Sequence, residues 1–296
     1  MKAEQIVIHF SLEVYNKFFL SVIFFIFFIF IIINRQYTNI LVKKMALHFG
    51  NEGNNIAIIK DNPNYKNQMV SVSADKMENQ FKSLKLNNGY FQPIGNWNAE
   101  RTVGYCVGSS GSGKSRFICN WVLEYKKKYK KNPIYLFSSL NEDVSLNPIK
   151  PLRVILDDVF LNETINLKDF ENSCVIFDDI DTIANKKIKD KVYTIMNQML
   201  NTGRHHNISV WCVNHTPTGN KTETKTILNE AHQIVFFCAN YSRQLQYLLE
   251  NYCGIDKKQF KYINSLDSRW TCFNKHYPQS IITDKHCIMM SELNNK

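Results

Sequence analysis

The chain has 296 residues, enough for one well-packed domain of about 200 residues with extensions. A formal net charge of +10 favours an anionic partner, either nucleic acid or nucleotide, although a basic soluble enzyme would carry it too. The eight cysteines include no C-x-x-C pair, which argues against a disulfide framework or a zinc site and predicts buried thiols in a reducing compartment.

An apolar run over residues 18–33 is the first feature along the chain, and Ser21 is its only polar residue. A helix of this length spans roughly 24 Å, less than the ~30 Å hydrocarbon core of a bilayer. No small-residue cleavage site follows the run, which argues against a signal peptide. We expect residues 1–44 to be a separate apolar segment with three alternatives: a membrane anchor, a mistaken start that precedes the true start at Met45, or a buried or partner-binding segment.

Residues 45–100 are rich in Asn, Lys and turn residues, and we expect an irregular polar extension with one short strand at 69–72. Residues 101–285 differ, because short apolar runs alternate there with amphipathic patterns such as 187–202. Unbroken apolar runs are typical of parallel strands that are covered on both faces. The sequence therefore predicts a layered α/β domain with a mainly parallel sheet, followed by a tail at 286–296. The expected strands are 102–107, 134–138, 153–156, 174–178, 208–213 and 233–238.

The octapeptide Gly108–Ser115 matches G-x-x-x-x-G-K-[ST], the phosphate-binding loop, between an expected strand and an expected helix. Its glycines allow the backbone to turn its N–H groups toward phosphate oxygens. Lys114 would reach the β- and γ-phosphates, and the Ser115 hydroxyl would bind Mg²⁺. The expected nucleotide-binding residues are Gly108, Ser109, Ser110, Gly111, Ser112, Gly113, Lys114, Ser115 and Arg116.

A second Mg²⁺ ligand is expected at the end of a neighbouring strand, and two aspartate pairs compete for this role. Asp178 and Asp179 end the stronger apolar run and lead into an amphipathic helix, whereas Asp157 and Asp158 are followed at once by apolar residues. We therefore predict that Asp178 binds Mg²⁺ and that Asp179 orients or activates the attacking water. The aspartates at 157 and 158 are expected in a turn.

Polar residues flank the strand expected at 208–213. Arg204 could stabilise transition-state charge near a γ-phosphate, in its own subunit or a neighbour, or could be an ordinary helix-terminal arginine. Asn214 or His215 could hydrogen-bond the γ-phosphate or water, or could form a simple turn after the strand. No other residues with metal-ligand spacing accompany His205 and His206 in the sequence, so we assign them no metal. The lysines at 126, 127, 128, 130 and 131 are typical of a solvated helix end, with direct nucleic-acid contact as the alternative.

Five segments together resemble the virion DNA-packaging ATPases of nucleocytoplasmic large DNA viruses, the poxvirus-like branch of the FtsK–HerA superfamily. The similarity covers about residues 100–285, with the segments in the same order and at compatible spacing. The Gly-Arg-His corner joined to the Ile-Leu-Asn-Glu segment is the most specific feature, whereas the phosphate loop is generic. The segments are GSSGSGKS (108–115), VIFDDI (175–180), TGRHHNISV (202–210), ILNEAHQIVFF (227–237) and Ser268-Arg-Trp270 with Tyr277-Pro278.

This resemblance implies a RecA-like (ASCE) P-loop NTPase domain that hydrolyses ATP with Mg²⁺. It further implies a homo-oligomeric ring that threads double-stranded DNA into a capsid, in the virion or a viral factory of the host cytoplasm, against a capsid or portal component. Arg204 would act as an arginine finger across a subunit interface. Asp179 stands where many members carry Glu, and Asn214 or His215 where many carry Gln.

Two other functions fit the same motifs. A membrane-anchored DNA pump of the cell-division or conjugation type would use the apolar run at 18–33. A nucleotide-binding assembly scaffold with weak hydrolysis would tolerate the departure at the water-activating position. DNA contacts are expected with the backbone, because no motif that reads base sequence is present.

Overall fold

The computed structural model describes residues 23, 25–32, 45–74, 80–140, 142–217, 221–237 and 243–293. The chain divides into two units, Met1–Met45 and Ala46–Lys296. In the first unit residues 25–32 are helical and exposed. Within the described ranges, no helix is both long enough and apolar enough to cross a membrane. Residues 18–22, 24 and 33 of the apolar run lie outside the described residues, and the three alternatives for residues 1–44 stay predictions.

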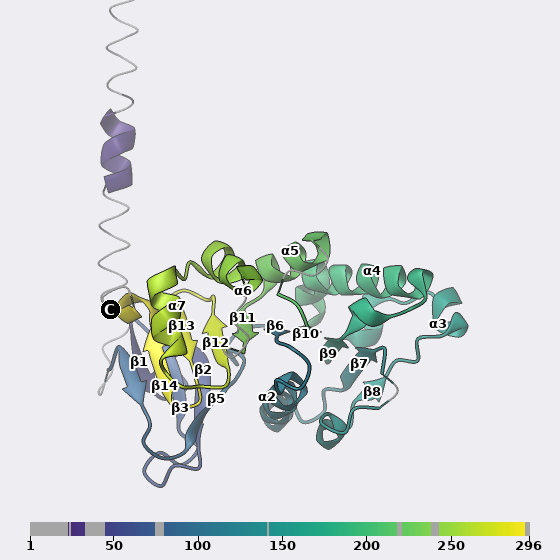
Figure 1. The fold of residues 1–296 in the computed structure, drawn as a ribbon, viewed down its shortest axis with the longest axis horizontal. Helices are drawn as coiled ribbons and strands as arrows, with labels where there is room; N and C mark the ends of the chain where they lie inside the picture. Colours follow the sequence, from purple (N-terminus) through teal and green to yellow (C-terminus); the bar gives the residue numbers. More distant parts are fainter. Residues whose placement is uncertain are drawn as a thin grey trace, which may run out of the picture. The chain divides into compact units, whose positions relative to one another are not determined.

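A ten-stranded sheet forms the centre of the second unit, with the strand order β4-β14-β13-β12-β11-β6-β10-β9-β7-β8 (Figure 1). The six strands from β11 to β8 run parallel. Strand β10 lies between the strand before the phosphate loop and the strand that ends at Asp178, which is the RecA-like arrangement. The parallel strands are β6 (Val103–Val107), β7 (Ile134–Ser138), β8 (Leu152–Arg153), β9 (Cys174–Asp178), β10 (Ser209–Asn214) and β11 (Gln233–Phe236).

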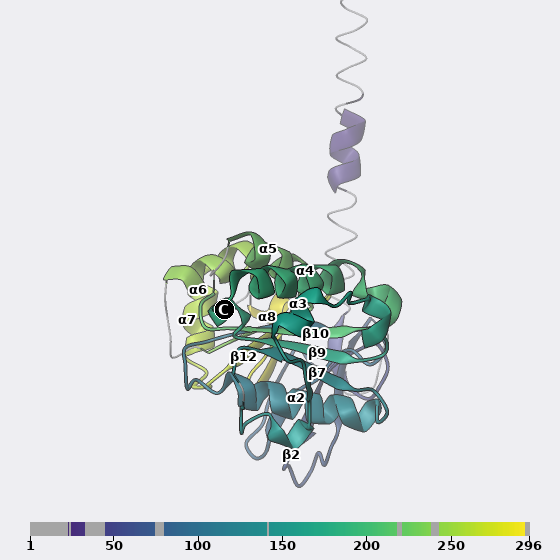
Figure 2. The ribbon, with the colours of Figure 1, turned by 90° about the vertical axis from the view of Figure 1, so that its right-hand side faces the viewer.

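Helices cover both faces of this sheet, as its unbroken apolar strands predict. Figure 2 shows α2 (Lys114–Lys128) on one face and α4 (Lys186–Thr202) and α5 (Lys221–Glu230) on the other. Successive residues of β6 alternate between the two cores: Tyr105 packs with the α4 side and Cys106 with the α2 side. The predicted α/β fold with a mainly parallel sheet is confirmed.

Helix α4 illustrates how local sequence sets the boundaries of an element. The Asn185 side chain accepts hydrogen bonds from the backbone N–H groups of Lys187 and Ile188 and so caps the helix. Residues at helical spacing along one face, including Ile188, Val192 and Met199, are buried. The helix predicted at 187–202 is therefore confirmed. The remaining helical segments are α3 (Asp158–Asn162), α6 (Arg243–Leu248), α7 (Lys257–Asn264), α8 (Met290–Leu293), the 3₁₀ turns η1 (Asn147–Ile149), η2 (Leu167–Phe170), η3 (Ile180–Thr182) and η4 (Gly203–His206), and the π-helical turn η6 (Leu249–Cys253).

The prediction of an irregular extension at 45–100 is wrong. Four strands there form an antiparallel sheet in the order β1-β3-β2-β5, and β4 (Ser83–Lys85) joins the edge of the large sheet. Short strands between Asn- and Gly-rich turns give little periodicity, and the five central residues of β2 are all buried, which removes the alternation expected of a strand. The strand expected at 69–72 is confirmed as part of β3. The four strands are β1 (Ala46–Phe49), β2 (Asn54–Lys60), β3 (Met69–Ser73) and β5 (Tyr90–Pro93).

The residues at 286–296 do not form a separate tail over their described part. Strand β14 (His286–Met289) pairs with β13 (Ser280–Ile282) and with β4, while β12 (Thr271–Asn274) pairs antiparallel with β11. A boundary at residue 285 would cut the hairpin between β13 and β14. The antiparallel strands thus extend the parallel sheet beyond the predicted domain end.

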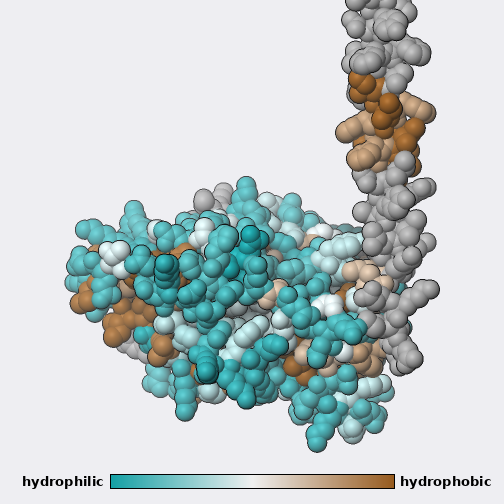
Figure 3. Space-filling model, turned by 180° about the vertical axis from the view of Figure 1, so that it is seen from behind, coloured by the Kyte–Doolittle hydropathy of each residue, from teal (hydrophilic) through white to brown (hydrophobic). Residues whose placement is uncertain are grey.

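The strand predicted at 153–156 is wrong in extent, because β8 covers only Leu152 and Arg153. Of its apolar residues, Val154 and Leu156 are only partly buried against the core, and Ile155 is 73% exposed. Val159, in α3, is also 64% exposed. Figure 3 shows this apolar surface at the α3 end of the sheet. Strand β8 is at the edge of the described sheet, so no further strand covers this run. For this reason the apolar residues alone predicted a longer strand than the structure has. The seven cysteines within the described ranges are buried and unpaired, as expected of core residues.

Candidate nucleotide-binding site

The predicted site residues meet at the carboxyl edge of the parallel strands. Strand register places Asn214 beside Val107, the residue before the phosphate loop, and Val213 beside Asp178. Ser138, at the end of β7, is on the other side of Asp178. Ligands of open α/β sheets bind at this edge, beyond the carboxyl ends of the strands.

The phosphate loop has the backbone that its glycines predict. Gly111 and Gly113 have φ values of +71° and +110°, which side chains disfavour. A Cβ at Gly108 would lie 2.6 Å from the Ser112 hydroxyl and 2.9 Å from the Phe237 ring. Helix α2 begins at Lys114 with no side-chain cap, so its first N–H groups face the loop. This is the geometry in which a helix N-terminus binds an anion.

Lys114 points back into the loop and is only 6% exposed. Its ammonium donates to the carbonyl oxygens of Gly108 at 2.9 Å and Ser109 at 3.2 Å, and it lies 3.1 Å from Nδ1 of His215. The positive charge is thus held among neutral acceptors. A phosphate group at the loop would be a stronger acceptor than any of them.

His215 links this lysine to Asp179. Its Nε2 lies 2.8 Å from Oδ2 of Asp179. The lysine ammonium can only donate, so Nδ1 of His215 must accept and Nε2 must carry the proton that is donated to Asp179. Asp179 itself has a left-handed backbone with φ of +50°, and its Oδ1 is buried with no hydrogen-bond partner among the described residues. The three side chains form one continuous chain across the site.

Asp178 is the buried carboxyl group of the site, with 3% exposure. Burial, together with the neighbouring Asp179 and Asp143, raises its pKa to about 7, although Lys114 and Arg153 oppose the rise. A cation would relieve this cost. Among the described residues no cluster of three or more His, Cys, Asp or Glu side chains could hold a metal alone. Asp178 and Ser115 are residues that could hold a Mg²⁺ ion if it also takes oxygen ligands from nucleotide phosphates and water.

The structure separates the alternatives that the sequence left open. Asp157 caps α3 by accepting from the N–H of Phe160 at 2.9 Å, so it serves a helix start rather than a strand end. The side chain of Asn214 lies near the Tyr105 hydroxyl, which donates to the carbonyl oxygens of Thr216 and Pro217, whereas His215 faces Lys114. Of these two polar positions, His215 belongs to the site.

Arg204 lies at the opposite, amino edge of the sheet, because it precedes β10 in η4. The six residues of β10 separate it from the phosphate loop by about 17–20 Å. An arginine finger acting within its own subunit is therefore wrong. Arg204 is instead paired at 3.5 Å with Glu100, and both side chains are about two-thirds exposed. The neighbouring Arg101 is buried and donates to the carbonyl oxygens of Met199 and Leu200 at the end of α4, which fixes η4 in place.

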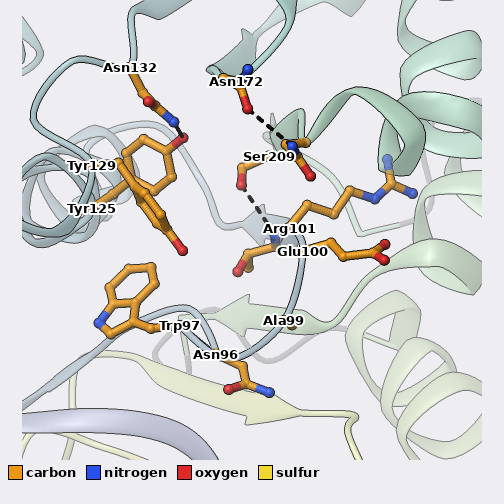
Figure 4. Close-up of a pocket in the computed structure, with 12 residues that line it drawn as sticks. Asn96, Trp97, Ala99, Glu100, Arg101, Tyr125, Tyr129, Asn132, Asn172 and Ser209 are labelled. Carbon is orange, nitrogen blue, oxygen red and sulfur yellow. Dashed lines mark hydrogen bonds between the residues drawn. The ribbon is translucent and has the colours of Figure 1, made fainter.

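A cavity of about 260 Å³ lies at this amino edge and is drawn in Figure 4. Trp97 and Tyr129 form one wall with ring centroids 5.8 Å apart, and Ser209 and Arg101 lie across from them. Tyr129 and Asn132, which follow α2, line this cavity together with Glu100, the ion-pair partner of Arg204.

Arg269 contacts the phosphate loop, although the sequence assigns it no role. Its Nη2 donates to the carbonyl oxygen of Gly111 at 3.0 Å, from the segment between α7 and β12. The only signal in the sequence is its place in the Ser268-Arg-Trp270 segment of the resemblance. A contact over 158 residues of sequence separation has no local pattern that predicts it.

The strand order, the loop and the paired aspartates define a P-loop NTPase fold of the RecA-like class. No family model matches the chain. Protein V3 of Sputnik virophage, named as uncharacterized, is 38% identical over 214 residues, which are 72% of this chain and 85% of V3. The chain therefore belongs to the same protein family as V3.

Solved structures resemble the chain at lower identity. The genome packaging NTPase B204 from Sulfolobus turreted icosahedral virus 2, in complex with AMP, is 14% identical with a TM-score of 0.45, covering 63% of this chain and 98% of B204. EssC (ATPases 2 and 3) from Geobacillus thermodenitrificans is 16% identical with a TM-score of 0.40, covering 80% of this chain and 44% of EssC.

Proposed function

We propose that the protein is an ATP-hydrolysing motor that moves double-stranded viral DNA into a capsid. The observation that carries the proposal is the chain Lys114–His215–Asp179 beside buried Asp178 at the mouth of the phosphate loop. The segments that resemble the poxvirus-like packaging ATPases supply the DNA-packaging role, and the virophage relative fits a viral origin. The test is whether ATP hydrolysis by the full chain is stimulated by double-stranded DNA.

The residues divide the chemistry among them. Loop N–H groups and Lys114 bind the β- and γ-phosphates of ATP. Ser115 and Asp178 hold Mg²⁺, which when bound neutralises charge on the phosphates. Asp179 accepts a hydrogen bond from the attacking water and orients it. His215 positions the Asp179 carboxylate through the hydrogen bond that its Nε2 donates. Because Nδ1 of the same ring accepts from Lys114, the position of Asp179 depends on where the Lys114 ammonium lies.

DNA contact would use the basic character of the chain. The amino edge of the sheet gathers Arg204 and the lysines that end α2, of which Lys127 pairs with Glu124 at 2.7 Å. Phosphate contacts of this kind release counterions, so binding to DNA should weaken steeply with salt. We place the protein in the virion or a viral factory of the host cytoplasm, docked on a capsid or portal component.

Replacing His215 with alanine should lower kcat for ATP by about 100-fold, because Asp179 loses its positioning donor. KM for ATP should change much less, since Lys114 keeps its phosphate contacts. Asn214→Ala is the matched control, because its side chain lies near the Tyr105 hydroxyl rather than in the chain from Lys114 through His215 to Asp179. Steady-state kinetics of both variants make the comparison. Equal losses in kcat would remove His215 from the mechanism.

Arg204 acts across a subunit interface in the proposed ring, and mixed rings test this. Arg204→Ala and Lys114→Ala subunits should each be inactive alone, yet a 1:1 mixture should recover activity. Random mixing leaves roughly a quarter of interfaces with an intact loop and an intact finger from different subunits. A mixture of Lys114→Ala with Asp178→Asn is the control, because both residues belong to one subunit's site and no rescue is expected. Rescue absent from the first mixture argues against a trans finger.

A membrane-anchored DNA pump is the second candidate, and the apolar run at 18–33 favours it. Comparing the full chain with a form that begins at Met45 separates the two. An anchored pump pellets with membranes only when residues 1–44 are present, whereas the packaging motor stays soluble in both forms. A scaffold with weak hydrolysis would show ATP binding but no stimulation by DNA.

A further inference from the structure

A cavity of about 210 Å³ lies directly beside the phosphate loop, on the side of Ser112 and Gly113. Arg116 and Asn120, one and two turns into α2, line the same cavity. With phosphates bound to the loop N–H groups, the nucleoside part must leave the loop at one of its sides. This cavity lies at one of those sides.

Planar side chains form the walls of the cavity. Trp270 lines it and packs edge-on against Phe117 with ring centroids 5.1 Å apart. Phe237, after β11, reaches the loop closely enough that a Cβ at Gly113 would lie 3.6 Å from its ring. The Arg269 guanidinium is fixed beside them by its bond to Gly111. Aromatic rings and a planar guanidinium are surfaces on which a nucleobase stacks.

Asp284 supplies a polar group that lacks a partner. Its Oδ1 is buried and has no hydrogen-bond partner among the described residues. Its backbone is fixed, because its N–H faces the Ser268 hydroxyl at 3.5 Å and its carbonyl accepts from Phe91 at 2.8 Å. An ionised carboxylate can only accept hydrogen bonds, and Asp284 is the acidic residue of the cavity lining, so it is the group there that suits a donor on a bound ring. The exocyclic amino group of adenine is such a donor, attached to a flat ring.

We propose that this cavity binds the adenine base of the nucleotide, stacked between the planar walls, with Asp284 accepting a hydrogen bond from the 6-amino group. Arg269 and Trp270 position the base, and Asp284 is the specificity-determining residue. The inference rests on the proposed binding of ATP at the phosphate loop. It adds a subsite contributed by the antiparallel part of the sheet, far from the loop in sequence.

The experiment compares the Kd of two nucleotides by isothermal titration calorimetry with Mg²⁺ and the full chain. Purine riboside triphosphate lacks only the 6-amino group of ATP. The unmodified protein should bind ATP about tenfold more tightly than this analogue, as expected for one charge-assisted hydrogen bond. In Asp284→Ala the two Kd values should become equal. Loss of the carboxylate charge affects both nucleotides alike, so the ratio isolates the amino contact.

Two further variants keep the test decisive. Asp190→Ala removes an equally charged but exposed residue on α4 and should leave the ratio unchanged. Asp284→Asn, which keeps a carbonyl acceptor, should give an intermediate ratio and serves if the alanine variant does not fold. A ratio near one in the unmodified protein, or an unchanged ratio in both Asp284 variants, overturns the base subsite. Failure of ATP binding altogether, with no difference between the unmodified protein and Lys114→Ala, would instead overturn the proposed function.

Discussion

Replacing Lys114 with alanine should lower ATP hydrolysis by about 100-fold or more, to the background of the assay. Lys114 is the only charged residue of the loop Gly108–Ser115. The residue is 6% exposed. Charge that develops on the γ-phosphate would lose its nearest cation. His215 would also lose the donor to its Nδ1, so the position of Asp179 would be disturbed as well.

The lysine variant should still fold, because Nζ of Lys114 contacts loop carbonyls and His215 and no core residue. Thermal unfolding checks this, and Lys187→Ala, an exposed lysine of α4, is the matched control for a lost positive charge. Turnover should be measured with Mg²⁺ at saturating ATP. A Lys114→Ala protein that is folded and retains more than a small fraction of hydrolysis would remove the phosphate loop from the catalytic site.

Replacing Asp178 with asparagine should abolish Mg²⁺-dependent turnover and, in the absence of Mg²⁺, stabilise the fold. The first effect follows from loss of the buried carboxylate ligand. The second follows from its pKa, which burial and Asp179 raise to about 7. The folded state then binds the proton more tightly than the unfolded chain, so the free energy of unfolding falls as pH rises from about 4 to about 7. Asparagine does not ionise, so the variant should not lose this free energy of unfolding, which is on the order of a few kcal/mol.

The difference in Tm between the two proteins therefore depends on pH in a defined direction. Without Mg²⁺, the asparagine variant should gain most over the unmodified protein at pH 8 and much less at pH 5, where Asp178 is protonated in the folded state. Asp157→Asn is the control: it makes the same chemical change at the cap of α3, where an asparagine oxygen can still accept from the N–H of Phe160, so Tm should change little at either pH. A gain in Tm that is the same at both pH values would contradict a raised pKa at Asp178.

The fold was predictable where the information is local. The phosphate loop is one contiguous octapeptide, and β9 and β10 are unbroken apolar runs that end in polar residues. The order of parallel strands then follows from the RecA-like class. The small sheet of residues 46–93 was not predictable, because β2 is buried on both faces and its neighbours are short.

The site was only partly predictable for the same reason. Asp178 and Lys114 are found by motif, but the choice of His215 over Asn214 needs side-chain directions. Arg204 is a conspicuous residue in the sequence, yet only the strand register shows that its edge of the sheet is opposite the loop. Asp284 and Arg269 approach the loop from more than 150 residues away, beyond any sequence spacing rule.

The measurement that tests the proposed function most directly is ATP hydrolysis by the full chain with Mg²⁺, with and without linear double-stranded DNA, at low and high salt. A packaging motor should hydrolyse ATP faster with DNA, lose that stimulation as salt rises, and lose all turnover in Lys114→Ala. Hydrolysis that DNA does not change at either salt concentration would contradict a DNA motor and leave a nucleotide-binding scaffold as the function of this fold.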